Sequence, residues 1–294
     1  MTTSTDGLRP TIGNWGRWGD DDEVGALNHL TPERVIASLQ IPTQGRVIAL
    51  GSEIGKRGAL TGGRNPTWHV SISVQHPSDP GRGRAEDTLT LHTHAHSHMD
   101  GLAHIWKDGH LYNDFPSTEV GRGGANRLSI GNVGGIVARG VLLDVTQDGD
   151  RTWRVGELIE IAELELALSA HATTLCAGDA VMVRTGWFDL FKSGDKAFHQ
   201  GEPGLSESAT DWLAAQDPVL VGMDNSALEP MPVAAGVNPL YVHETLLRDH
   251  GIYMLELLDL AELAATHVSP FLFVAAPLQI DRGLGSPINP VAVI

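Results

Sequence analysis

The chain has 294 residues, and its 36 acidic and 20 basic side chains give a formal net charge of −16. So acidic a chain is poorly suited to nucleic-acid backbones or anionic membranes, and its single cysteine excludes an intrachain disulfide and a multi-cysteine zinc site. No apolar run approaches the roughly 18 residues of a membrane span, and residues 1–11 lack the apolar core of a signal peptide. We therefore expect a cytoplasmic protein that acts on a small molecule and binds neither nucleic acid nor membrane.

The N-terminal part of the chain is predicted to be irregular before its first helix. Residues 1–27 are rich in glycine and aspartate and are expected to form an irregular arm, with the acidic run 20–23 in a solvated loop. Thr31, Pro32 and Glu33 indicate a helix start, because Thr is a good N-cap, Pro fits the first turn and Glu favours the positive end of the helix dipole. Strands are then predicted at 46–50 and 69–74, a basic loop at 56–64 and a turn region at 78–84.

The rest of the chain mixes predicted strands and helices without a clear domain boundary. Apolar runs of strand length occur at 136–145, 179–185, 219–223, 252–258 and 271–280, and helices are expected at 155–170, 206–215 and 242–250. Gly251 is well placed to cap the last of these helices in the left-handed conformation. This pattern predicts one α/β domain over residues 1–294 with a mixed or closed sheet.

Five of the 14 histidines gather in one segment, L-H-T-H-A-H-S-H-M-D-G-L-A-H, which ends at His104. Residues 89–98 have the pattern of an extended strand, in which side chains two positions apart share a face. His94, His98 and Asp100 then form a candidate ligand set, because imidazole nitrogen and carboxylate oxygen suit Zn²⁺, Mn²⁺ or Fe²⁺. His104 follows Asp100 by four residues, where it can be a ligand or a base beside the metal.

A histidine run can also be an adventitious metal patch or a pH-sensitive surface. Even in a true metal centre, not all five histidines can be essential. We therefore assign His92 and His96 to packing, to support of the ligands or to the surface.

Three later polar residues are further candidates for the site. Glu256 lies within an apolar run, and an acid in such a run is rarely buried without a partner or a metal. Asp224 ends a predicted strand, where functional residues often gather, and Ser226 follows it closely. These two residues are candidates for substrate binding, with an ordinary Asx turn as the equally weighted alternative.

Three tryptophans, Arg184 and Cys176 were also considered as functional residues. Trp68, Trp106 and Trp187 could line a flat aromatic pocket, although packing in the core is the commoner role of such residues. Arg184 could bind a substrate carboxylate, but a structural ion pair is the commoner explanation. Cys176 is expected to be buried and inert.

The segment H94-A-H-S-H98-M-D100-G-L-A-H104 resembles the H-x-G-T-H-x-D-x-x-x-H motif of a metal-dependent cyclase family, which includes bacterial kynurenine formamidases and isatin hydrolases. The resemblance covers nearly the whole chain, because further stretches resemble family segments at 18–28, 184–187, 222–226, 242–247, 251–256 and 285–290. His96 stands where the motif has glycine, and Ser97 stands where it has threonine.

The resemblance implies a metal centre with one or two ions per chain. His94, His98 and Asp100 correspond to the ligands of one metal, and Asp100, His243 and Glu256 correspond to those of a second metal. A site of histidines and carboxylates without thiolate fits Mn²⁺ or Zn²⁺, which are the expected cofactors.

The same resemblance assigns His104 as the catalytic histidine beside the activated water. The expected activity is hydrolysis of an amide, cyclic amide or aryl-formamide C–N bond, because a divalent metal makes water more acidic and a nearby histidine can move its proton. Three alternatives remain at this point: a lactone hydrolase, a cyclase or dehydratase on the same site, and a metal-binding protein without turnover.

For the fold, the resemblance implies a swivelling β/β/α type with a barrel-like sheet and surrounding helices. Family members are commonly dimers or tetramers, so a homodimer or homotetramer is expected. Residues 15–27 are hypothesised to help close the pocket of a neighbouring chain.

Overall fold

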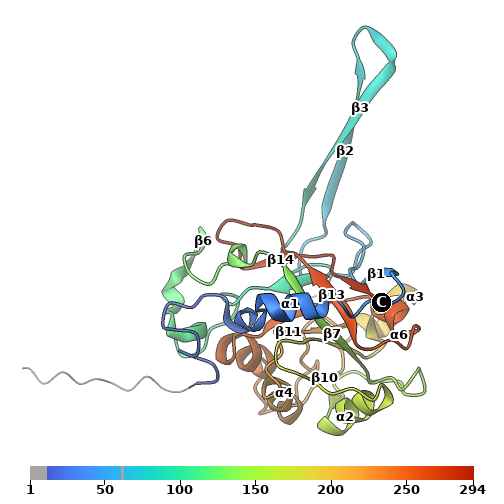
Figure 1. The fold of residues 1–294 in the computed structure, drawn as a ribbon. Helices are drawn as coiled ribbons and strands as arrows, with labels where there is room; N and C mark the ends of the chain where they lie inside the picture. Colours follow the sequence, from blue (N-terminus) through green and yellow to red (C-terminus); the bar gives the residue numbers. More distant parts are fainter. Residues whose placement is uncertain (1–11, 61–62) are drawn as a thin grey trace, which may run out of the picture.

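A nine-stranded sheet carries the core of this computed structural model, which describes residues 12–60 and 63–294 (Figure 1). In order across the sheet, its strands are β1 (Val47–Ala49), β15 (Val291–Val293), β13 (Phe271–Ala275), β7 (Ile136–Asp144), β9 (Ala180–Arg184), β11 (Leu220–Met223), β12 (Tyr253–Glu256), β4 (His98–Asp100) and β14 (Gly285–Pro287). The four strands β7, β9, β11 and β12 run parallel, and antiparallel strands flank them on both sides. The sheet is therefore mixed, as expected, and it curls within an α/β fold (Figure 1).

The parallel strands form the centre because their sequences are continuously apolar. Nearly every residue of β9, β11 and β12 is buried, which is typical of parallel strands covered on both faces. Glu256, at the end of β12, is the one acidic residue in these three strands, and it is 3% exposed. The fold thus places a carboxylate inside the apolar layer.

Helices surround the sheet, and α1 and α2 both contact β7. The helices are α1 (Pro32–Ser38), α2 (Ile161–Ala170), α3 (Trp187–Ser193), α4 (Glu207–Ala214), α5 (Tyr241–His243) and α6 (Ala261–Ala264), with a π-helical continuation of α5, η6 (Glu244–Asp249). Short 3₁₀ turns are η1 (Gly25–His29), η2 (Tyr112–Asp114), η3 (Ser117–Glu119), η4 (Ile130–Asn132) and η5 (Lys196–His199). None of the helices in the described part of the chain is long and apolar enough to cross a membrane.

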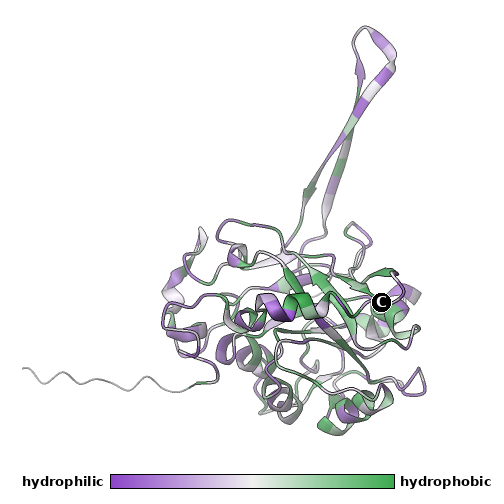
Figure 2. Ribbon diagram, viewed as in Figure 1, coloured by the Kyte–Doolittle hydropathy of each residue, from purple (hydrophilic) through white to green (hydrophobic). Residues whose placement is uncertain are grey.

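Three two-stranded ribbons stand apart from the main sheet: β2 (Trp68–His76) with β3 (Asp79–Thr90), β5 (Val120–Gly121) with β6 (Gly124–Ala125), and β8 (Leu158–Ile159) with β10 (Gly204–Leu205). The β2–β3 ribbon projects from the body as a long hairpin (Figure 1). Figure 2 shows that the tip of this hairpin is hydrophilic, whereas the strands within the body are predominantly hydrophobic.

Predicted element ends were partly confirmed. Thr31 caps α1, its side chain accepting a hydrogen bond from the Arg34 amide, and Gly251 follows η6 with a φ of +64°. The helix expected from residue 155 begins only at Ile161, because β8 occupies the start of that segment. The last predicted strand ends at Ala275 rather than at residue 280, and the turn region 78–84 lies largely within β3.

The described part of the N-terminal arm is largely irregular, as predicted, and it packs against the rest of the chain. Trp15 is buried, and its indole nitrogen donates to the carbonyl oxygen of Arg248 at 2.7 Å, so this part of the arm packs on its own chain, and a contribution to a neighbour's pocket stays a prediction. The acidic run is only partly a solvated loop: Asp20 and Asp21 are exposed, whereas Asp22 accepts from the Gly25 amide at 2.9 Å and Glu23 pairs with Arg127 at 2.7 Å. Residues 1–11 of the predicted arm lie outside the described residues.

Candidate metal centre

Strand pairing brings the first part of the centre together. Residue 98 of β4 lies directly opposite residue 256 of β12, and Nε2 of His98 is 3.1 Å from Oε2 of Glu256. Asp100 follows His98 by two residues, so it points to the same face of the strand. His98 Nε2 is 3.4 Å from Asp100 Oδ1, and all three side chains are at most 3% exposed.

His94 and His104 enter the centre from the turns before and after β4. The Nε2 atom of His94 is 3.4 Å from Asp100 Oδ1, and the His94 and His104 rings stack with centroids 4.2 Å apart. His94, Asp100 and His104 each offer one ligand atom, and these three atoms lie within 4.8 Å of one another. A Cβ at Gly285 would lie 2.5 Å from His94 Nε2, so this close approach of β14 requires glycine.

His243 reaches the centre from the end of α5. Its Nε2 lies 3.6 Å from Asp100 Oδ2 and 3.4 Å from Glu256 Oε1. On its other side, Nδ1 is 2.8 Å from Glu229 Oε2, and the same carboxylate accepts a hydrogen bond from the backbone N–H of His243. A carboxylate in this position fixes the ring orientation of a metal ligand. The sequence analysis missed Glu229.

The buried atoms of this cluster fit a metal ion. Three buried atoms have no hydrogen-bond partner among the described residues: the two carboxylate oxygens of Asp100 and the Nε2 atom of His94. Buried polar atoms without partners are costly, and a cation would satisfy them. A set of histidine nitrogens and carboxylate oxygens without thiolate is one that Mn²⁺ and Zn²⁺ accept.

Electrostatics also favour a cation at this centre. Burial alone would disfavour a charged His98, but the Glu256 and Asp100 carboxylates outweigh burial and raise the pKa of His98 to about 10. The two buried carboxylates therefore require positive charge beside them. His94 behaves differently, because burial lowers its pKa to about 4, and burial also lowers the pKa of His104. These two rings are neutral near pH 7.

The histidine segment is not the straight strand that alternation predicted. Residues 91–97 form turns, and β4 begins only at His98. His96 has a φ of +57°, a left-handed conformation that glycine adopts most readily and that His tolerates better than most residues. This backbone accounts for the glycine in the family motif at this position. His92 is exposed, which agrees with the surface role among the three alternatives predicted for it.

His96 and Ser97 support the segment from outside the cluster. The Nε2 atom of His96 is 2.6 Å from Oγ1 of Thr67, and the ring is buried. The hydroxyl of Ser97 donates to the carbonyl oxygen of Leu257 at 2.6 Å, which ties the segment to the end of β12. A hydroxyl suffices for this bond, so serine can replace the threonine of the motif.

Asp224 and Ser226 both form hydrogen bonds within the protein. Asp224 is 2% exposed and accepts hydrogen bonds from the Thr185 amide at 2.9 Å and the Gly186 amide at 2.7 Å. Burial raises its pKa to about 6. Ser226 donates from its amide and its hydroxyl to Glu202 Oε2 at 2.9 and 2.8 Å. These bonds give both residues structural tasks, and substrate contact stays a prediction for them.

The tryptophan candidates, Arg184 and Cys176 lie in different environments. Trp68 and Trp106 are 52% and 51% exposed, whereas Trp187 is buried in a cluster with Phe188 and Phe198. Substrate binding by Trp68 and Trp106 stays a prediction. Arg184 pairs with Asp144 at 3.1 Å and Asp189 at 2.7 Å, as the structural explanation expected. The prediction that Cys176 is buried was wrong, because this residue is exposed.

Glu202 is a second buried acid that the sequence analysis missed. It is 2% exposed, its Oε1 atom has no hydrogen-bond partner among the described residues, and it lines a cavity of about 510 Å³. Burial raises the pKa of Glu202 to about 8, and the nearby Glu256 and Glu229 carboxylates add to this effect against the hydrogen bonds from Ser226.

This raised pKa predicts a specific pH dependence of stability. Folding favours the protonated form of Glu202. The contribution of this residue to the free energy of unfolding is therefore fully present below pH 4.5 and is lost as the pH rises toward about 8. The loss amounts to at most about 1.4 kcal/mol per pH unit. We expect Glu202→Gln, which stays uncharged, to gain stability relative to the wild type as the pH rises from 5.5 to 8.5. Urea unfolding of both proteins measures this difference, and an unchanged difference over that range would refute the assignment.

A sequence model of the family described as "Putative cyclase" matches residues 36–230, which include the segment from His94 to His104. The chain belongs to this family. Isatin hydrolase from Roseibium aggregatum is 30% identical over 141 residues, which make up 45% of this chain and 51% of that protein. The chain thus matches about half the length of this curated relative.

Solved structures of the cyclase family share the fold. The crystal structure of a novel cyclase is 31% identical, with a TM-score of 0.87 over 96% of this chain and all of that chain. Isatin hydrolase A from Labrenzia aggregata, bound to benzyl benzoate, is 20% identical, with a TM-score of 0.65 over 91% of this chain and 98% of its own. At that identity the second likeness shows the fold alone.

Proposed function

We propose that this cyclase-family chain is a metal-dependent hydrolase that cleaves the C–N bond of an amide, a cyclic amide or an aryl-formamide. The observation that carries the proposal is the buried pair Asp100 and Glu256 among four histidines, where neither Asp100 oxygen has a hydrogen-bond partner within residues 12–60 and 63–294. The likeness to a protein named isatin hydrolase supports the same reaction class.

In this proposal the metal is Mn²⁺ or Zn²⁺, and its ligands come from the residues already predicted: His94, His98, Asp100, His243 and Glu256. A bound divalent metal supplies Lewis acidity, which polarises a carbonyl group and makes water more acidic. The Glu229 carboxylate holds the His243 ring by its Nδ1 atom, so that Nε2 faces Asp100 and Glu256.

The proton transfers fall to His104. Burial lowers the pKa of His104, so an imidazole nitrogen is free to accept the proton of the attacking water near pH 7. The same ring then returns this proton to the leaving nitrogen as the C–N bond breaks. His94 stacks on His104 with centroids 4.2 Å apart, which restricts the rotation of the base.

We place a small aromatic substrate in the cavity that Glu202 lines, because the Glu202 carboxylate interacts electrostatically with Glu256 of the metal centre. The cavity of about 510 Å³ has an apolar wall that includes Leu60, Phe198 and Met231, and its polar atoms come from Glu202 and Ser226. A mostly apolar pocket of this size with a few polar groups is typical of small-molecule sites.

The direct test is an assay of the metal-loaded chain with isatin, an aryl-formamide and a lactone in ¹⁸O-labelled water. Cleavage of isatin or the formamide with one label incorporated supports the proposal. Turnover of the lactone alone would assign a lactone hydrolase, and product without label would assign a cyclase or dehydratase. A metal-loaded chain without turnover of any substrate in the panel would contradict the proposed reaction.

A further inference from the structure

The side chain of Glu202 lies on the wall of the cavity of about 510 Å³ with one oxygen unused by the protein. Its Oε2 atom accepts hydrogen bonds from the amide and the hydroxyl of Ser226 at 2.9 and 2.8 Å. Its Oε1 atom is buried and has no hydrogen-bond partner among the described residues. Buried polar atoms without partners are rare and costly in folded proteins, so a ligand in the cavity is the natural partner of Oε1.

The backbone holds Glu202 firmly in this position. The Glu202 amide donates to the carbonyl oxygen of Met231 at 2.8 Å, and the Met231 amide donates to the carbonyl oxygen of Glu202 at 2.9 Å. A Cβ at Gly201 would overlap the Met231 carbonyl group, so this close approach of the two segments requires glycine. A side chain on such a fixed backbone loses little freedom when it binds a ligand.

The free oxygen of Glu202 is suited to donate a hydrogen bond. Because Ser226 donates twice to Oε2, the proton of the neutral acid resides on Oε1. Burial raises the pKa of Glu202 to about 8, and the carboxylates of Glu256 and Glu229 add to this effect, so the acid is predominantly protonated near pH 7. Glu202 therefore presents an O–H group to the cavity.

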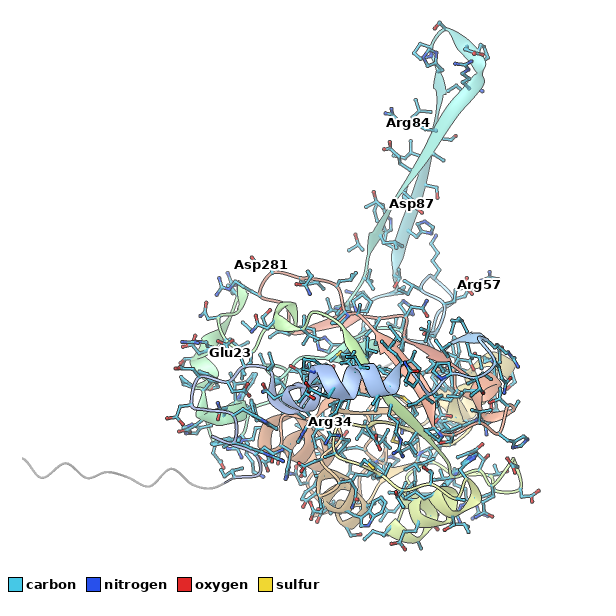
Figure 3. All side chains as sticks on the ribbon, viewed as in Figure 1. Glu23, Arg34, Arg57, Arg84, Asp87 and Asp281 are labelled. Carbon is cyan, nitrogen blue, oxygen red and sulfur yellow. The ribbon has the colours of Figure 1, made fainter. Side chains whose placement is uncertain are left out.

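The surroundings of the cavity provide no buried positive charge that would keep Glu202 ionised. His199 is the one basic residue among the described residues that line the cavity, and it is exposed. Arg57, from the loop that contributes Leu60 to the wall, is exposed and projects outward at the edge of the body (Figure 3). An uncharged, mostly apolar molecule with an oxygen acceptor therefore matches the cavity.

Apolar packing connects the cavity with the metal centre. Phe198, on the cavity wall, belongs to a buried cluster that includes Trp187 and Leu257. Leu257 directly follows Glu256, the proposed metal ligand, and Glu256 interacts electrostatically with Glu202. A substrate whose reacting bond lies at the metal would extend from there toward Glu202.

We propose that Glu202 is a substrate-binding residue that donates a hydrogen bond from Oε1 to an uncharged oxygen acceptor, and that it selects aryl amides and cyclic amides over aryl ammonium compounds of the same size. Ser226 acts through Glu202 as a positioning residue, because its two hydrogen bonds direct Oε1 away from it. This inference rests on the proposed function for the place of the bond that is cleaved.

The test measures the binding of two bicyclic probes to the metal-loaded chain by titration calorimetry: oxindole, an uncharged cyclic amide, and 2-aminoindane, a cation near pH 7. We expect oxindole to bind the wild type more tightly. Glu202→Leu removes the donor and should weaken oxindole binding by about tenfold or more, whereas Glu202→Gln keeps an uncharged donor and should stay within about threefold of the wild type. Glu262→Leu removes an exposed acid of α6 and should leave this affinity unchanged.

Three results would overturn the role of Glu202. The first is an unchanged affinity for oxindole in Glu202→Leu, and the second is a wild type that does not bind oxindole. The third is tighter binding of 2-aminoindane that is lost in Glu202→Gln, because Glu202 would then be an ionised acceptor.

These binding measurements fail separately from the proposed hydrolysis, because they need no turnover. Oxindole binding that depends on Glu202, in a chain that cleaves no substrate of the panel, would support the role of Glu202 and contradict the hydrolysis. Cleavage with the same KM in the wild type and in Glu202→Leu would support the hydrolysis and contradict the role of Glu202.

Discussion

Asp100→Asn is expected to lower the affinity of the chain for Mn²⁺ and Zn²⁺ by more than about a hundredfold. Asp100 faces His94, His98 and His243 at 3.4–3.6 Å, and its two buried oxygens have no hydrogen-bond partner in the part of the chain that the structure describes. Asparagine has nearly the same shape but removes the negative charge. Loss of groups that merely support a ligand costs about 10–100-fold, so loss of a shared ligand should cost more.

Titration calorimetry with Mn²⁺ measures this affinity. Glu202→Gln is the matched control, because it changes another buried acid to its amide outside the cluster and should bind the metal as the wild type does. Asp100→Asn that binds Mn²⁺ with the affinity of the wild type would refute the assigned centre.

His104→Ala is expected to keep the metal and to lower kcat by about 10²–10⁴-fold, the usual contribution of a positioned acid–base group. The ring is neutral near pH 7 because burial lowers its pKa, and it stacks on His94 beside Asp100. The readout pairs steady-state kinetics on the cleaved substrate with metal content of the same preparation. A control is His92→Ala, which removes an exposed histidine of the same segment and should leave both values unchanged.

Two results would contradict this role of His104. Full activity of His104→Ala would show that another group moves the proton. Loss of the metal would show that His104 is a ligand. Its position permits that role too, because ligand atoms of His94, Asp100 and His104 lie within 4.8 Å of one another.

The sequence predicted the members of the cluster better than their arrangement. Period-two spacing placed His98 and Asp100 on one face, which is how β4 presents them. The pairing of His98 with Glu256 depends on the register between strands far apart in the chain, and no local pattern contains that register. Alternation also cannot distinguish a straight strand from successive turns, so the left-handed conformation of His96 was not predicted.

Glu229 and Glu202 were missed for a different reason. Each is a single acid in a loop beside a proline, at Pro230 and Pro203, and such loops carry no hydrophobic periodicity. Only tertiary structure buries these carboxylates to 2–3% exposure. The available signal for Glu229 was its position between two apolar residues, Leu228 and Pro230. This signal is weaker than the longer apolar run around Glu256.

The central claim is most directly tested by the metal content of the chain, measured by elemental analysis after purification without chelator and without a metal-affinity tag. We predict one or two equivalents of Mn or Zn per chain, and their loss in His98→Ala. A wild type that contains no metal and takes up neither Mn²⁺ nor Zn²⁺ when either is added would contradict the centre, and the proposed hydrolysis with it.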